Sequence, residues 1–211
     1  MIRFIKRQIL LVAVLLSTGI SANAQFYELT NQVTRLVSPA LSGGFNYKGY
    51  VEASYLRGVG DDRLDVVDFS TTQGFKYSSW CFMGVGAGID LMIPNLDYRH
   101  HEDVQVMMPL YVDFRFTFGN PSRVGVSLDL RLGAAFTFDD FPTNYGYIYE
   151  DEAFYFRPSL YFRIPINKNN SKQALNLGFT YQLLVADYYG YSYWDNNKAF
   201  NNLGATIGFE W

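Results

Sequence analysis

From residue 43 to the C-terminus, apolar and polar side chains alternate at every second position in eight successive segments. In the first segment, Tyr47, Val51 and Tyr55 fall in one phase, whereas Lys48 and Glu52 fall in the other. A period of two places neighbouring side chains on opposite faces of a β-strand, so the pattern predicts an all-β domain. The expected strands are 43–55, 67–77, 81–91, 108–118, 124–138, 154–166, 174–184 and 200–211.

The connections between these strands alternate in length. Three are short, at 78–79, 119–122 and 167–172, and three are longer, at 92–106, 139–152 and 185–199, while the first, at 57–63, is intermediate. Short periplasmic turns alternating with longer external loops are typical of outer-membrane barrels. The chain is therefore predicted to form an eight-stranded antiparallel up-and-down β-barrel with both ends in the periplasm.

The charged residues of the strands fall almost entirely in one phase. The other phase carries no charge within the expected bilayer-length stretch, because Asp65 falls at its outer rim. Equal numbers of acids and bases are expected where buried charges need partners, so we predict that twelve residues form a charge network in the lumen. They are Lys48, Glu52, Asp68, Lys76, Asp90, Asp113, Arg115, Asp129, Arg131, Arg157, Arg163 and Glu210.

Side-chain size also separates the two faces. The charged phase contains many glycines, whereas the other phase is rich in Phe, Leu, Tyr and Ile. A barrel of eight strands has little internal room, so the bulky apolar face is predicted to point outward to lipid. A soluble lipocalin-like barrel, with apolar residues inside, is the competing interpretation.

Aromatic residues at both strand ends predict two interfacial belts. Three prolines, Pro109, Pro158 and Pro165, are expected near strand ends.

The N-terminus has the layout of a secretory signal peptide. Arg3, Lys6 and Arg7 precede the apolar run 9–16, and Ala22-Asn23-Ala24 forms a small-x-small cleavage site. A buried N-terminal helix is the alternative, although it gives no reason for this order. We expect cleavage of residues 1–24, a periplasmic lead at 25–42 that contains a short helix or packs more simply, and a barrel over 43–211.

Charge and cysteine content exclude several classes of protein. The net charge of the whole chain is −3, and loss of the three basic N-terminal residues takes it to −6, which argues against nucleic-acid binding. Cys81 is the single cysteine, so no internal disulfide holds the fold. No apolar run after residue 24 is long enough for a transmembrane helix, so a spanning domain must be a closed barrel.

Several motifs resemble the OmpA/OmpX-like outer-membrane β-barrel family, in an uncharacterised "porin family" branch. They are SPALSGGF at 38–45, GYVEA at 49–53, GVGAG at 84–88 and PLYVDFR at 109–115. The end of the chain, with Ile207, Phe209 and Trp211, looks like the aromatic insertion signal that the outer-membrane assembly machinery reads. Trp211 also suits a simple interfacial anchor, and the two interpretations are compatible.

Two groups of loop residues are candidate sites. His100 and His101, near Asp97, Glu102 and Asp103, are weak candidates for a catalytic or metal site, because no other histidine completes one. Tyrosine-rich loops offer large amphipathic area for recognition, although they also suit capping of the barrel. The candidates are Tyr145, Tyr147, Tyr149, Tyr188, Tyr189, Tyr191, Tyr193 and Trp194.

The expected function is a structural or surface-interaction role in the outer membrane, exerted through external loops. A small ion-conducting channel is the alternative, and an enzyme or a soluble ligand-binding barrel fits the sequence less well. The expected partners are outer-membrane lipid, lipopolysaccharide and, during biogenesis, the assembly machinery. No catalytic residue, metal or cofactor is expected.

Overall fold

The structure is a computed structural model that describes residues 46–59, 64–78, 80–94, 104–120, 122–137, 148–167, 170–189 and 198–211. Within these ranges, no helix has the length and apolar character needed to cross a membrane. The predicted signal peptide and the lead at 25–42 lie outside the described residues.

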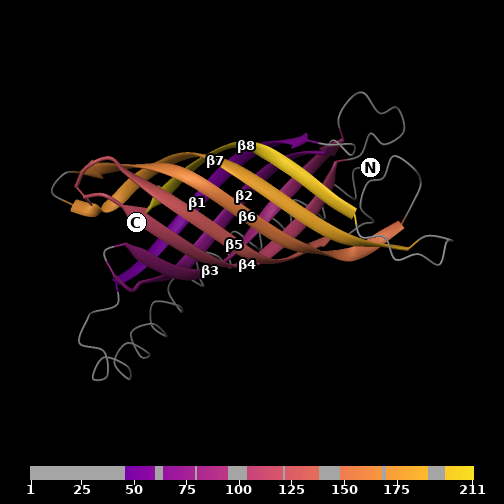
Figure 1. The fold of residues 1–211 in the computed structure, drawn as a ribbon, viewed down its shortest axis with the longest axis horizontal. Coiled ribbons are helices and arrows are strands. Elements are labelled where there is room, and N and C mark those ends of the chain that lie inside the picture. The colour runs from indigo at the N-terminus through magenta and orange to yellow at the C-terminus, as the bar shows by residue number, and fades with distance from the viewer. Residues whose placement is uncertain are drawn as a thin grey trace, which may run out of the picture. The chain divides into compact units, whose positions relative to one another are not determined.

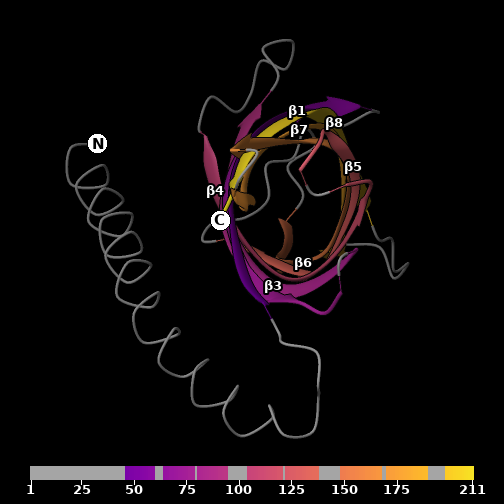
Figure 2. The same ribbon diagram turned by 90° about the vertical axis from the view of Figure 1, so that its left-hand side faces the viewer.

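Eight antiparallel strands close into a barrel in which each strand pairs with its neighbour in sequence and β8 returns to β1 (Figures 1 and 2). This confirms the predicted architecture. The strands are β1 (Asn46–Val59), β2 (Leu64–Lys76), β3 (Cys81–Pro94), β4 (Gln105–Phe118), β5 (Gly125–Thr137), β6 (Ile148–Asn167), β7 (Asn170–Tyr189) and β8 (Lys198–Glu210).

The seam between β1 and β8 is held by a continuous ladder. Tyr50 lies opposite Glu210, and the register continues to the pair of Val59 and Asn201. Beyond it, Gly49 and Trp211 exchange two backbone hydrogen bonds, with N···O distances of 3.2 and 3.1 Å. Closure gives each of the eight described strands a paired neighbour on both sides, which is the condition for placing a sheet in lipid.

The two ends of the barrel differ in their connections. We call the end where β2–β3, β4–β5 and β6–β7 are joined the turn end, and the opposite end the loop end. At the turn end, Gly119 adopts φ 106°, a conformation that favours glycine, and the backbone N–H of Ser122 donates to the Asn120 side chain at 2.9 Å. A short β4–β5 turn is therefore confirmed, although the connection spans 119–124 instead of the predicted 119–122.

The strands extend further toward the loop end than the alternation predicts. β6 begins at Ile148 and β7 ends at Tyr189, so the predicted loops 139–152 and 185–199 are too long. The connection predicted at 92–106 is likewise shortened by β3 and β4. At the end of β3 both faces are apolar, as at Leu91, Met92 and Ile93, whereas β6 begins with an acidic run, so strands extend where the polar–apolar alternation has stopped.

The expectation that all three prolines lie near strand ends is wrong for Pro158, which sits in the middle of β6. It keeps its position opposite Leu130 of β5, while the β6–β7 ladder is interrupted between Phe156 and Ser159. Proline lacks a backbone donor, so it removes a hydrogen bond on one side of its strand only. The surrounding ladders are long enough to tolerate that loss.

Candidate functional site in the barrel lumen

The structure places the twelve charged residues singled out above on the inward faces of the strands. All are buried except Lys76, which is half-buried. The inward side chains separate into three ionic groups and an apolar layer, described here in turn.

The central ionic group consists of Glu52, Asp113, Arg115, Asp129 and Arg131, contributed by β1, β4 and β5. The Arg115 Nη2 atom lies 2.8 Å from Asp129, 3.2 Å from Asp113 and 3.2 Å from Glu52. Arg131 pairs with Asp129 at 2.9 Å and also forms an ion pair with Glu52. Each guanidinium therefore meets several carboxylates, which offsets the cost of removing these charges from water.

The second ionic group, the Asp68 group, lies nearer the loop end. Asp68 pairs with Arg157 at 2.8 Å, and Arg157 also donates to Ser54. Asp90, directly opposite Asp68 on β3, accepts a hydrogen bond from Gln182 at 3.1 Å. This group joins residues from β1, β2, β3, β6 and β7, so it crosses the lumen from one wall to the other.

The third ionic group lies at the turn end. Glu210 accepts from the Arg163 guanidinium at 2.6 Å and from the Lys48 ammonium. These residues come from β1, β6 and β8, and Lys76 of β2 lies at the same end of the barrel. The lumen therefore carries more basic than acidic side chains here, in contrast to the two groups above it.

Aromatic rings separate the ionic groups. The Arg115 guanidinium lies 3.8 Å from the ring centroid of Tyr50, which contacts Phe82 edge-on at 5.0 Å. Tyr111 and Tyr155 stack at 5.8 Å on the other side of the central group. The sequence places Tyr50, Phe82 and Tyr111 in the charged phase, but that phase alone does not indicate that they divide the lumen into layers.

An apolar layer, which the alternation of side chains did not predict, fills the loop end of the lumen. Its members are buried inward residues from all eight strands, and they form one contiguous cluster. They are Leu56, Leu64, Val66, Met92, Met107, Tyr111, Ala135, Ala153, Tyr155, Leu184, Ala186 and Phe200. Some strand ends, such as Leu91-Met92-Ile93, carry apolar residues in both phases, so alternation there does not show which residues point inward.

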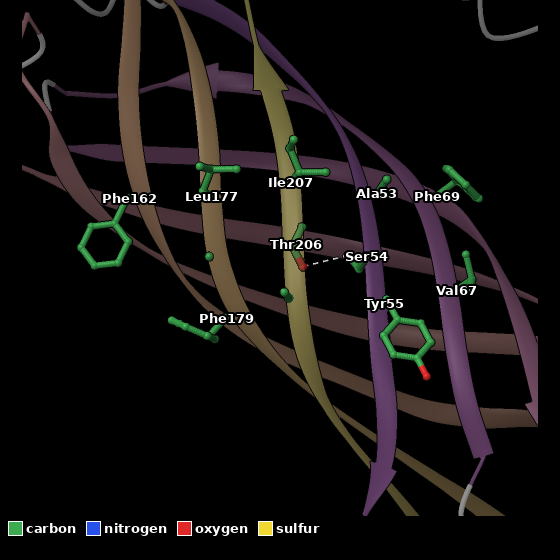
Figure 3. A pocket seen from close by; sticks show the side chains of 12 residues that line it. Ala53, Ser54, Tyr55, Val67, Phe69, Phe162, Leu177, Phe179, Thr206 and Ile207 are labelled. Atoms are coloured by element: carbon green, nitrogen blue, oxygen red, sulfur yellow. Dashed lines mark hydrogen bonds between the residues drawn. The ribbon is translucent and has the colours of Figure 1, made fainter. Parts of the chain in front are cut away.

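The outer wall carries the bulky apolar phase. Phe69, Val85, Phe179 and Ile207 are each about half exposed or more, although all four are large and apolar. An open groove of about 630 Å³ runs across β6, β7, β8, β1 and β2 on this wall, and Figure 3 shows Phe69, Phe162 and Phe179 around it. Its lining contains hydroxyl groups but no carboxylate, amine or histidine.

The C-terminal residues lie at the turn end of the barrel. Ile207 is exposed on the outer wall, and the rings of Phe209 and Trp211 stack at 6.1 Å. The Trp211 indole occupies the space that a Cβ at Gly49 would need, which explains why a glycine stands in the bulky phase of β1. Trp80 stacks on Phe116 at 5.8 Å.

The structure describes only some of the loop residues that the sequence singles out as candidates. His100, His101, Tyr145, Tyr147, Tyr191, Tyr193 and Trp194 lie outside the described residues. The assignment of the remaining three tyrosines to loops is wrong, because Tyr149 belongs to β6 and pairs with Tyr188 of β7, while Tyr189 pairs with Ile148. The described part of the chain holds no group of three His, Cys, Asp or Glu side chains arranged for a metal ion.

No family model and no curated protein matches the sequence. Among solved structures, neisserial surface protein A (NspA) matches with a TM-score of 0.51 and 11% identity, over 79% of this chain and 97% of that one. The N-terminal β-barrel domain of Pseudomonas aeruginosa OprF matches with a TM-score of 0.37 and 12% identity, over 80% of this chain and 100% of that domain. Yersinia pestis outer membrane protein Ail matches with a TM-score of 0.36 and 13% identity, over 79% of this chain and 100% of that one. The match to NspA confirms the resemblance to small eight-stranded barrels at the level of fold.

Proposed function

We propose that this chain is an integral outer-membrane β-barrel that serves as a closed, non-conducting scaffold for its external loops. The observation that carries the proposal is the inside-out distribution of side chains. Fully buried Arg115, Arg131 and Arg157 lie in the lumen, whereas Phe69 and Phe179 project from the wall. A protein in water hides large apolar groups, and a barrel in lipid presents them.

A soluble ligand-binding barrel fits this distribution poorly. Such a barrel keeps an apolar cavity inside and polar side chains outside. Here the middle of the lumen is occupied by ion pairs such as Arg115–Asp129, which leave no apolar chamber there. The groove of Figure 3 lies on the outer wall, where the acyl chains of lipid would cover it. Outer-membrane lipid and lipopolysaccharide are therefore the partners that we propose for the wall.

A conducting pore is also disfavoured. An ion entering from the loop end meets the apolar layer around Leu56, Met92 and Met107, which are fully buried or nearly so. Beyond it, the Asp68 group and the central group cross the lumen. An apolar constriction opposes the passage of ions because it offers them no replacement for water. The weak-channel alternative would require rearrangement of both the layer and the ion pairs.

Export and assembly follow from the same proposal. Residues 1–24 would be removed as a signal peptide, and β8 would present Ile207, Phe209 and Trp211 to the assembly machinery. Ile207 is exposed on the outer wall, as expected of the lipid-facing side of the last strand. The loop tyrosines would supply recognition outside the cell, and we propose no catalytic role for them.

Cell fractionation with heat-dependent gel mobility tests the location and the closed barrel together. We expect the protein in the outer-membrane fraction, shortened at its N-terminus, and a faster-migrating band in unboiled samples, because a closed ladder of eight strands resists detergent. A protein that is soluble without detergent and migrates identically with and without boiling would contradict the proposal.

Planar bilayers test the scaffold against the channel. We expect the purified barrel to insert without discrete conductance steps, since the apolar layer closes the lumen at the loop end. A general porin in the same bilayers serves as the positive control for insertion and detection. Reproducible steps from the pure protein would instead support the weak-channel alternative.

A further inference from the structure

Asp68 and Asp90 face each other across the β2–β3 ladder, and both side chains point into the lumen. They are direct partners in the register, and each is 0% exposed. Partners on one face of an antiparallel pair have Cβ atoms about 4.5–5.5 Å apart, so the two carboxyl groups lie side by side. Two adjacent buried carboxylates repel each other unless something neutralises one of them.

The described contacts supply a single cation to this pair. Arg157 lies 2.8 Å from the Asp68 Oδ1 atom. Arg131, the next arginine on this side of the lumen, donates to Ser70 and Tyr111 and forms its ion pairs with the central group. Two carboxylates against one guanidinium leave one negative charge, and burying an uncompensated charge is costly.

The hydrogen bonds also show that the two carboxyl groups lack donors. Asp68 Oδ1 accepts from Arg157 and from the hydroxyls of Ser54, at 3.1 Å, and Ser70, at 3.3 Å. Asp90 Oδ2 accepts from Gln182 at 3.1 Å. The other oxygen of each carboxyl, Asp68 Oδ2 and Asp90 Oδ1, has no donor in the described structure. Ionised carboxylates only accept hydrogen bonds, so neither can satisfy the other.

The surroundings offer few other ways to neutralise the pair. The ionisable or charged neighbours are Arg157 and Tyr155 on β6, with Arg131 and Tyr111 on β5 and β4. Ser54, Thr206 and Gln182 supply the neutral polar groups on β1, β8 and β7. Gly88, next to the pair on β3, leaves little spare room, because a Cβ there would lie 3.2 Å from Asp68 Oδ2.

We propose that Asp68 and Asp90 share one proton in the folded barrel, carried by Asp90 Oδ1 and donated to Asp68 Oδ2. The carboxyl O–H bond forms as an O–H bond of a hydronium ion breaks, which leaves a water molecule, and nothing is oxidised or reduced. The two oxygens without donors then satisfy each other, and the pair keeps a single negative charge that matches the charge of Arg157. Asp90 is the natural carrier because its other oxygen bonds the neutral Gln182, whereas Asp68 faces the guanidinium.

Infrared spectroscopy of the folded barrel in detergent tests this protonation state directly. At neutral pH we expect a C=O stretching band of a protonated carboxyl group, shifted on transfer to D₂O and removed in the variant Asp90→Asn. An asparagine has the shape of the neutral acid and keeps a donor toward Asp68. The matched control is Asp65→Asn at the rim of β2, which should retain the band. A wild-type spectrum without the band, or a band that keeps its full intensity in Asp90→Asn, would overturn the proposal.

Denaturation against pH provides a second, independent readout. Aspartates of an unfolded chain are ionised at neutral pH, so the folded barrel would hold one extra proton and its stability would fall as pH rises. Asp90→Asn should flatten this dependence, whereas Asp68→Asn, which removes the partner of Arg157, should lower stability at every pH. Stability that instead rises with Na⁺ or Mg²⁺ at constant ionic strength, and loses this response in Asp90→Asn, would assign the neutralising role to a bound cation and refute the shared proton.

Discussion

Replacing Arg131 by methionine is expected to lower the free energy of unfolding by about 3–5 kcal/mol, the usual range for breaking a buried ion pair by removing one partner. Arg131 is 0% exposed and meets Glu52 and Asp129 within the central group. Methionine has a similar length but no charge. The lost stability therefore measures the cost of leaving the buried carboxylates without this guanidinium. Three acids would then face Arg115 alone. Urea unfolding of the barrel in lipid vesicles, followed by tryptophan fluorescence, measures the change.

The matched control for this substitution is Arg123→Met in the β4–β5 connection. Arg123 is exposed, and a surface substitution of this kind usually changes stability by no more than about 0.5 kcal/mol. Glu52→Gln adds a further check, because residues in one network are coupled. The double variant Glu52→Gln/Arg131→Met should cost less than the sum of the single variants. Equal small losses for Arg131→Met and Arg123→Met would show that the central group does not stabilise the fold.

Replacing Phe179 by arginine on the outer wall is expected to cost about 2–4 kcal/mol in a bilayer, the range for a basic residue facing lipid at the midplane. Phe179 is 65% exposed and lies in the middle of β7, opposite Leu160 and Ala205. The cost arises because the guanidinium would have to be solvated within hydrocarbon. Reversible unfolding from vesicles measures it, and unboiled gel mobility reports the folded fraction.

Ile166→Arg provides the depth control on the same face. Ile166 is 58% exposed but lies near the turn end of β6, where the expected cost falls to about 0–1 kcal/mol. A clearly larger loss of stability for Phe179→Arg than for Ile166→Arg would show that the outer wall faces a hydrocarbon layer. If Phe179→Arg were as mild as a surface substitution, about 0.5 kcal/mol, the outer wall would face water and the soluble interpretation would regain support.

The alternation of side chains was sufficient to predict the strand number, the barrel and the side of the wall on which each charge lies. Period two fixes which residues share a face, so Arg115, Arg131 and Arg157 follow from the same pattern as Phe69 and Phe179. The pattern failed where the alternation stopped, either because both faces became apolar, as at Leu91, Met92 and Ile93, or because acidic residues follow one another, as at the start of β6. Strand ends therefore came out short, and Tyr149, Tyr188 and Tyr189 were assigned to loops instead of strands.

The tertiary structure decided which inward residues meet. Phase along one strand says nothing of the neighbouring strand's register, and the register places Asp68 beside Asp90 instead of beside a base. Closure of the barrel then brings Arg157 across from β6 and stacks the apolar layer over the loop end. Closure also sets Trp211 over Gly49. The sequence by itself determined a barrel with charges inside; how those charges pair depends on strand stagger and closure, which act between residues far apart in the chain.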